Sequence, residues 1–95
     1  MITKIIKVFP LDCREYTDRN NQKQVFKVKA FILHDGDSSI YAEAIQQDAE
    51  SLEALNPQPD TIVSVHMTCV CREYKTKNNE LRYANEFTIR KMMVL

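Results

Sequence analysis

Two stretches of ten residues decide how this chain folds: CREYTDRNNQ, residues 13–22, and CREYKTKNNE, residues 71–80. They are identical at six of their ten positions. Each follows an apolar segment and leads from a tyrosine into a polar run that contains two adjacent asparagines. Asparagine tolerates the left-handed backbone of tight turns, so each stretch predicts the end of a β-hairpin.

The rest of the sequence divides into further strands and one helix. Apolar alternation and β-branched residues predict five strands, at residues 2–16, 24–33, 39–45, 61–74 and 81–94. The first strand is expected to bend or bulge near Pro10, which has no N–H to donate to a sheet. Between the third and fourth strands the apolar period becomes helical over residues 47–55, and Asn56-Pro57 should end that helix.

The order of these elements indicates the fold class. Five strands with one short helix between the third and the fourth is the order of an OB-fold, a small all-β Greek-key barrel. An α+β sandwich with the same order of elements is the alternative. Because 95 residues suffice for one hydrophobic core, we expect a single domain that spans residues 1–95.

The register of the last hairpin can be argued from its apolar residues. A strict two-residue loop would pair Cys69 with Thr88, whereas one additional loop residue would pair Cys69 with Ile89. The longer loop also places Arg72 opposite Glu86. Because it keeps the apolar side chains on one face, we expect the longer loop.

The formal net charge is zero, but the charges are segregated along the chain. Residues 1–34 carry seven Lys or Arg and three Asp or Glu, residues 35–60 carry seven acids and no base, and residues 61–95 carry six bases and three acids. Neutrality therefore results from cancellation between separate surfaces. A polyanion would meet the two basic blocks if the fold brings them together.

In the layout of its elements, the chain resembles small bacterial or phage OB-fold domains that are similar to single-stranded-DNA-binding proteins. The resemblance is carried by IIKVFPLDCREYTDRNNQKQVFKVKAF, residues 5–31, and CREYKTKNNELRYANEFTIRK, residues 71–91. It implies a nucleic-acid groove flanked by the two hairpin loops into which the repeated segments lead. The chain has no Trp and no glycine-rich tail with an acidic tip, which favours an accessory binder of a phage, plasmid or mobile element.

Binding a single strand without sequence preference requires cations for the phosphates and flat rings for the bases. Lys27, Lys29 and Phe31 alternate onto one face of the second strand, which we expect to form the floor of the groove. The complete set of expected nucleic-acid-binding residues consists of strand-end, loop and floor residues: Arg14, Tyr16, Arg19, Lys23, Lys27, Lys29, Phe31, Arg72, Tyr74, Lys75, Lys77, Arg82 and Tyr83.

Other chemistry finds little support in the sequence. On a strand, Cys69 and Cys71 share one face while His66 points to the other, so the three do not converge on a metal ion. We expect these cysteines to be buried as small apolar residues. No nucleophile with an adjacent base can be named, so we expect no enzyme activity, no catalytic residue, no metal and no cofactor.

These observations predict a non-enzymatic module that binds single-stranded DNA, with RNA as the alternative ligand, by phosphate neutralisation and base stacking. The alternative function is a protein-interaction OB-fold that holds a peptide or a partner's loop. The cysteine number and the lysines that interrupt the N-terminal apolar stretch predict a cytoplasmic protein. The apolar C-terminal MMVL suggests a homo-oligomer, either a dimer or a tetramer.

Overall fold

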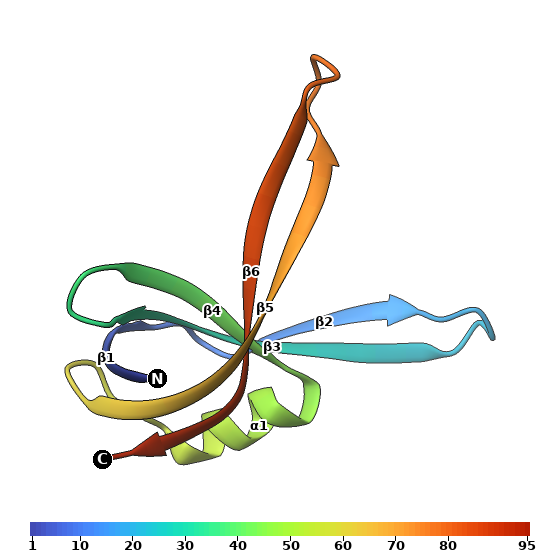
Figure 1. Ribbon diagram of the computed structural model, residues 1–95. Helices are drawn as coiled ribbons and strands as arrows, with labels where there is room; N and C mark the ends of the chain where they lie inside the picture. Colours follow the sequence, from blue (N-terminus) through green and yellow to red (C-terminus); the bar gives the residue numbers. More distant parts are fainter.

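Six strands and one helix follow one another along the chain in the computed structural model, which describes all residues from 1 to 95 (Figure 1). The elements are β1 (Ile2–Val8), β2 (Asp12–Thr17), β3 (Lys23–His34), β4 (Ser39–Ile45), α1 (Gln46–Leu55), β5 (Ile62–Lys75) and β6 (Leu81–Val94). The mainly β architecture and the position of the one helix confirm the expected order. No helix is long and apolar enough to cross a membrane.

The expected count of five strands is wrong because the first of them is interrupted. Phe9, Pro10 and Leu11 separate β1 from β2. Proline cannot donate a ladder hydrogen bond, and the chain changes direction there. Both strands still pair with β3: β1 pairs with the second half of β3, and β2 pairs with its first half.

The strand pairings return to their starting point. β1 pairs with β5, β5 with β6, β6 with β4, β4 with β3, and β3 again with β1. The β4–β6 pairing is parallel and the others are antiparallel. β2 pairs only with β3, so it extends the sheet beyond this circuit. The circuit encloses the core.

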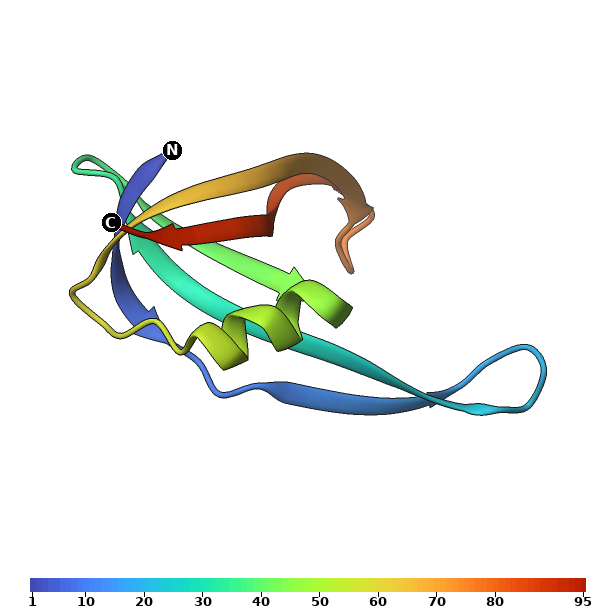
Figure 2. The ribbon, with the colours of Figure 1, turned by 90° about the horizontal axis from the view of Figure 1, so that it is seen from below.

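The core lies between the strands and helix α1. Phe31 and Leu33 of β3 are fully buried, as is Ile5 of β1. Helix α1 contributes Ala49 and Leu52 to the same cluster. Full burial of side chains such as phenylalanine and leucine stabilises a fold by about 1.5–3 kcal/mol each, so this cluster anchors the sheet. Figure 2 shows α1 lying along β3, which fixes the side of β3 that faces inward.

The repeated segments form two loops with the same hydrogen bonds. In the first loop the Asn21 N–H donates to the Asp18 carbonyl at 3.1 Å, and in the second the Asn79 N–H donates to the Thr76 carbonyl at 3.0 Å. Asn21 and Asn79 both have a left-handed backbone, with φ of 62° and 65°. A turn followed by a left-handed residue is a common three-residue hairpin loop. The repeat therefore encodes one loop geometry twice.

Both hairpins project from the body of the domain as two-stranded ribbons (Figure 1). We call residues 12–27 arm 1 and residues 70–86 arm 2. Every residue of β2 is exposed, and most of arm 2 is exposed as well. Because a ribbon of two strands buries little apolar surface, the arms are the least stabilised part of the fold.

Candidate nucleic-acid interface

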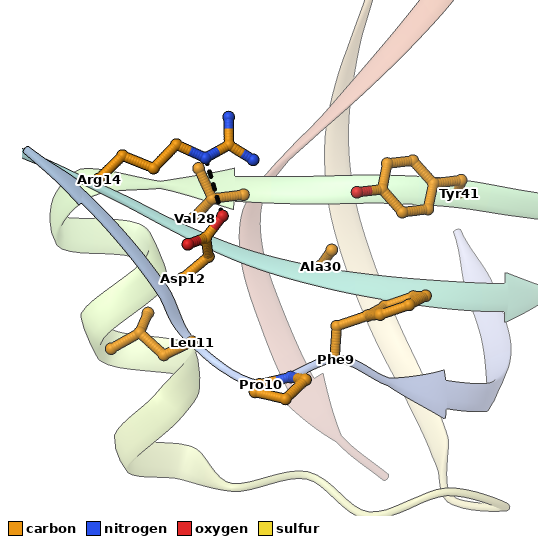
Figure 3. A pocket seen from close by; sticks show the side chains of 8 residues that line it. All are labelled: Phe9, Pro10, Leu11, Asp12, Arg14, Val28, Ala30 and Tyr41. Atoms are coloured by element: carbon orange, nitrogen blue, oxygen red, sulfur yellow. Dashed lines mark hydrogen bonds and ion pairs between the residues drawn. The ribbon is translucent and has the colours of Figure 1, made fainter.

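Two adjoining pockets lie on the side of β3 and β4 that faces away from the core. The first has a volume of about 350 Å³ and is formed by β2, β3, β4 and the segment that links β1 to β2 (Figure 3). Its lining consists of Phe9, Pro10, Leu11, Asp12, Arg14, Val28, Ala30 and Tyr41.

The second pocket has a volume of about 490 Å³ and lies where the two arms leave the body. Its lining comes from β3, β4 and β6 and consists of Phe26, Tyr41, Glu43, Ile45, Asn85, Glu86, Phe87 and Thr88. Tyr41 lines both pockets. They therefore form one continuous surface, which we call the groove.

Aromatic rings occupy the centre and one end of the groove. Phe9 and Tyr41 pack edge to face, with ring centroids 5.9 Å apart and an interplanar angle of 72°. The Lys7 ammonium lies 4.9 Å from the centroid of the Phe9 ring. Tyr41 is still 54% exposed, so one face of its ring is open to a ligand. Partial desolvation, together with the nearby Glu43 carboxylate, raises the pKa of Tyr41, so its hydroxyl stays protonated at neutral pH.

Each arginine along this surface has a carboxylate partner. Arg14 Nε donates to Asp12 Oδ2 at 2.8 Å, and Arg72 Nε lies 2.9 Å from Glu86 Oε1. Both guanidinium groups are more than half exposed. Because each interaction uses one nitrogen of a five-donor group, the remaining N–H groups can still bind phosphate.

Five of the expected residues share the groove side of the arms. Arg14 lines the groove, and Tyr16 follows two residues later on the same face of β2. On arm 2, Glu86 lines the groove and pairs with Arg72, which places that face of the arm beside it. The expected residues on the groove side are Arg14, Tyr16, Arg72, Tyr74 and Arg82.

Four further expected cations gather at the arm ends. Arg19 and Lys77 lie in the two loops, and Lys23 and Lys75 are the strand residues next to them. All four are exposed, and none forms an ion pair. The arms therefore present their unpaired positive charge at their ends rather than at their bases.

The expected groove floor of Lys27, Lys29 and Phe31 is wrong. This face of β3 points toward the core and helix α1, where Phe31 is fully buried. Lys27 pairs with Glu50, and Lys29 Nζ lies 2.6 Å from Glu53 Oε2. The acidic residues of α1 neutralise these lysines, which are therefore not available to a polyanion.

Tyr83 lies on the other face of arm 2 from Tyr74. It lies opposite Glu73 in the ladder and donates its hydroxyl to Glu73 Oε1 at 3.0 Å. Tyr74 lies opposite Arg82, one residue along, so Tyr74 and Tyr83 are on opposite faces of arm 2. Tyr83 therefore lies on the face of arm 2 opposite the Arg72–Glu86 pair, a face whose Asn85 reaches the wider pocket at the base of the arm.

The aromatic residues of the groove itself were not identified from the sequence. They are Phe9, Phe26, Tyr41 and Phe87. A signal for one of them was present, because Phe26 alternates with Val28 and Ala30 along β3. Both faces of β3 are rich in apolar residues. The face with the lysines was therefore expected to form the groove, and that expectation was wrong. The partners of those lysines lie on α1, which alternation within one strand does not reveal.

The expectation that Cys69 and Cys71 are buried is wrong. Both are free and exposed, Cys71 on arm 2 and Cys69 just before it. Cys13 on arm 1 is also free and exposed. No group of three or more His, Cys, Asp or Glu side chains is arranged to hold a metal ion.

Comparison with known proteins identifies the fold but no family. No protein-family model matches the chain, and no curated protein matches it. Among solved structures, the chain is similar to the second OB-fold domain of replication protein A from Methanococcus maripaludis, determined by solution NMR. The two superpose with a TM-score of 0.61 at 13% sequence identity, over 99% of this chain and 79% of the other. The chain therefore has an OB-fold.

Proposed function

We propose that this domain binds single-stranded DNA, with RNA as the alternative ligand, and that it has no enzyme activity. The observation that carries the proposal is the position of the groove between two arms that end in unpaired cations. OB-folds bind oligonucleotides on this side of the sheet, between the corresponding two loops. The structural neighbour belongs to a replication protein, which agrees with a nucleic-acid ligand.

In this proposal the arms hold the phosphate backbone. Arg19 and Lys23 on arm 1 and Lys75 and Lys77 on arm 2 attract the strand from two sides. Each arm contains about six consecutive residue pairs, which corresponds to a length of roughly 20 Å. Arms of this length could follow several nucleotides, in keeping with the range of about 4–16 nucleotides that one OB-fold covers.

The groove would hold the bases. The exposed ring of Tyr41 and the half-buried ring of Phe9 offer flat surfaces in the body, and Tyr16 and Tyr74 offer further rings on the arms. Stacking on an aromatic side chain contributes about 1–3 kcal/mol per base and is tolerant of sequence. The apolar residues Val28 and Ala30 line the same pocket as these two rings of the body.

Titration of a fluorescent oligothymidine at several salt concentrations tests the proposal. We expect binding that weakens as salt is added, with a log–log slope of about −0.7 for each neutralised phosphate. Substitution of Tyr16 or Tyr74 by Ala should weaken binding by more than the loss of one surface charge. Absence of binding at low salt would refute the proposal, and two silent tyrosine substitutions would refute the stacking role of the arms.

A protein partner is the second candidate, favoured by the carboxylates of the groove. Glu43 and Glu86 line its wider pocket, and Asp12 lines the other. These acids oppose a polyanion at the bases of the arms and suit a basic peptide. The same titration separates the candidates, because a peptide-binding groove predicts no salt-dependent affinity for oligothymidine.

Two architectural proposals accompany this function. The closed circuit of strand pairings supports a barrel in which β1 and β2 together act as the first of five strands. Met93 and Leu95, at the C-terminal end of the chain, are exposed, which supports a homo-oligomer. Light scattering coupled to size-exclusion chromatography tests the second point, since a monomer at micromolar concentration would contradict it.

A further inference from the structure

One carboxylate in the groove has no partner. Glu43 is half-buried on β4 and lines the wider pocket, yet it forms no ion pair and its side chain makes no hydrogen bond. The other acid of that pocket, Glu86, is held by Arg72 at 2.9 Å. Among buried side-chain oxygens and nitrogens only Thr3 Oγ1 lacks a partner, so the Glu43 carboxylate is still open to solvent and is the unpaired acceptor of the groove.

The neighbours of Glu43 form a flat, mainly apolar frame around it. Tyr41 and Ile45 flank it on the same face of β4, and Ala30 and Thr88 lie directly opposite it on the two adjacent strands. Phe26 and Phe87 line the same pocket. The Glu43 charge contributes to the raised pKa of Tyr41, which agrees with the closeness of the two side chains.

An ionised carboxylate is an acceptor only, with two oxygens side by side. A base that lies unstacked in such a groove exposes its Watson–Crick edge. Guanine is the one standard base with two adjacent donors on that edge, N1–H and the N2 amine. Adenine and cytosine offer an amine beside a ring nitrogen acceptor, and thymine and uracil offer one N–H between two carbonyls. Each of these four would place an acceptor against the carboxylate.

We propose that Glu43 makes the groove selective for a guanine base, whose N1–H and N2–H groups donate to the two carboxylate oxygens. This inference rests on the proposed binding of single-stranded nucleic acid and adds base selectivity to it. The base would stack against the exposed face of Tyr41, while the backbone is held at the arm ends. A two-bond contact of this kind discriminates among bases by about 5-fold to 150-fold.

The test compares labelled oligothymidines of about 12 nucleotides, a length within the range for one OB-fold. One is unmodified, and the others carry a single central guanine, hypoxanthine, adenine or cytosine. We expect the guanine oligonucleotide to bind about tenfold more tightly than the unmodified one. Hypoxanthine keeps N1–H and lacks the N2 amine, so it should lose most of this preference.

Two matched variants assign the preference to the proposed contact. Glu43→Met removes both acceptors at nearly constant length, so the ratio of the two dissociation constants should fall to about one. Glu15→Met makes the same change on the opposite face of β2, away from the groove, and should keep the ratio. If the wild-type protein binds the guanine and the thymine oligonucleotides with equal affinity, the guanine preference is overturned while the proposed function stands. If no oligonucleotide binds at low salt, the proposed function fails first and the role of Glu43 fails with it.

Discussion

The Nζ atom of Lys29 lies 2.6 Å from the Oε2 atom of Glu53, and this ion pair ties helix α1 to strand β3. The two partners differ in their surroundings: the lysine residue is 5% exposed, whereas the glutamate side chain is 46% exposed. Two more acids of α1 pair with the sheet, Glu50 with Lys27 and Asp48 with Arg90. The acidic helix therefore neutralises basic residues of its own sheet.

This asymmetry predicts different costs for the two halves of the Lys29–Glu53 pair. Replacing Glu53 with Ala leaves a buried ammonium without its partner and should lower the free energy of unfolding by about 1–3 kcal/mol. Replacing Lys29 with Met removes the buried charge and leaves Glu53 in contact with water. We expect that change to cost less than about 1 kcal/mol. Urea denaturation measures both free energies of unfolding. Equal losses for the two substitutions would show that the burial of Lys29 does not determine the cost.

The positions of the strands and the helix were predictable because they depend on local patterns. The helix was expected at residues 47–55 and is found at Gln46–Leu55, and its last turn ends at Asn56, whose N–H donates to the Leu52 carbonyl. The loops were predictable for the same reason, since the adjacent asparagines report a local backbone requirement. The break of the first strand at Pro10 was expected as a bend, although the structure turns it into two strands.

The register of arm 2 was predicted in part. Cys69 pairs with Phe87 rather than with Ile89, because the loop gains its extra residue before the asparagines rather than after them. This shift of two positions leaves the faces of the strand unchanged. Arg72 therefore still reaches Glu86, diagonally across the ladder.

The side of β3 that forms the groove could not be predicted, because it depends on tertiary contacts. Lys27 and Lys29 resemble surface residues in the sequence, and only the position of α1 explains why they face inward. Tyr41 and Phe9 become neighbours only when β4 and the segment after β1 meet across β3. The positions of the expected arm residues were easier to predict, since they follow directly from the repeat.

The two tyrosines of arm 2 provide a matched test of which face binds the bases. Tyr74 is 43% exposed on the groove side, and Tyr83 is 64% exposed on the opposite side. Tyr74→Ala should weaken oligothymidine binding about tenfold, within the range for one lost stacking contact. Tyr83→Ala should change it less than twofold. Fluorescence anisotropy measures both, and a larger effect at Tyr83 would show that the strand runs along the other face.

The left-handed asparagines in the loops predict how the repeat tolerates substitution. Glycine adopts a positive φ without steric cost, so Asn21→Gly and Asn79→Gly should change the free energy of unfolding by less than about 0.5 kcal/mol. Valine at either position should cost about 1–2 kcal/mol. Asn20→Val is the control, because Asn20 does not have a positive φ. Chemical denaturation that finds the same cost at Asn20 and Asn21 would contradict this explanation of the repeat.

The unpaired cations at the arm ends predict a change in the salt dependence of binding. Lys77→Gln should reduce the magnitude of the log–log salt slope by about 0.7, the amount for one phosphate contact on a single strand. Lys4→Gln removes the same charge from the body of the domain, where Lys4 lies 3.6 Å from Asp60, and should leave the slope unchanged. If the two variants give the same slope, the arm ends have no specific role and only total charge matters.

The first loop should respond to acid through Asp18. Its carboxylate accepts hydrogen bonds from the N–H groups of Gln22 and Asn20 and from the Gln24 side chain, and these bonds lower the pKa of Asp18. The ionised form is therefore favoured in the folded loop. The resulting stabilisation is complete above the pKa of the unfolded chain and is lost as the pH falls through the lower pKa of the folded loop.

In a pH titration followed by NMR, the Gln22 amide should shift with a midpoint below the ordinary aspartate value. Asp18→Asn keeps one acceptor oxygen and cannot ionise, so its Gln22 amide should lose that transition. A midpoint at or above the ordinary value in the unmodified protein would show that these bonds do not hold the loop in solution.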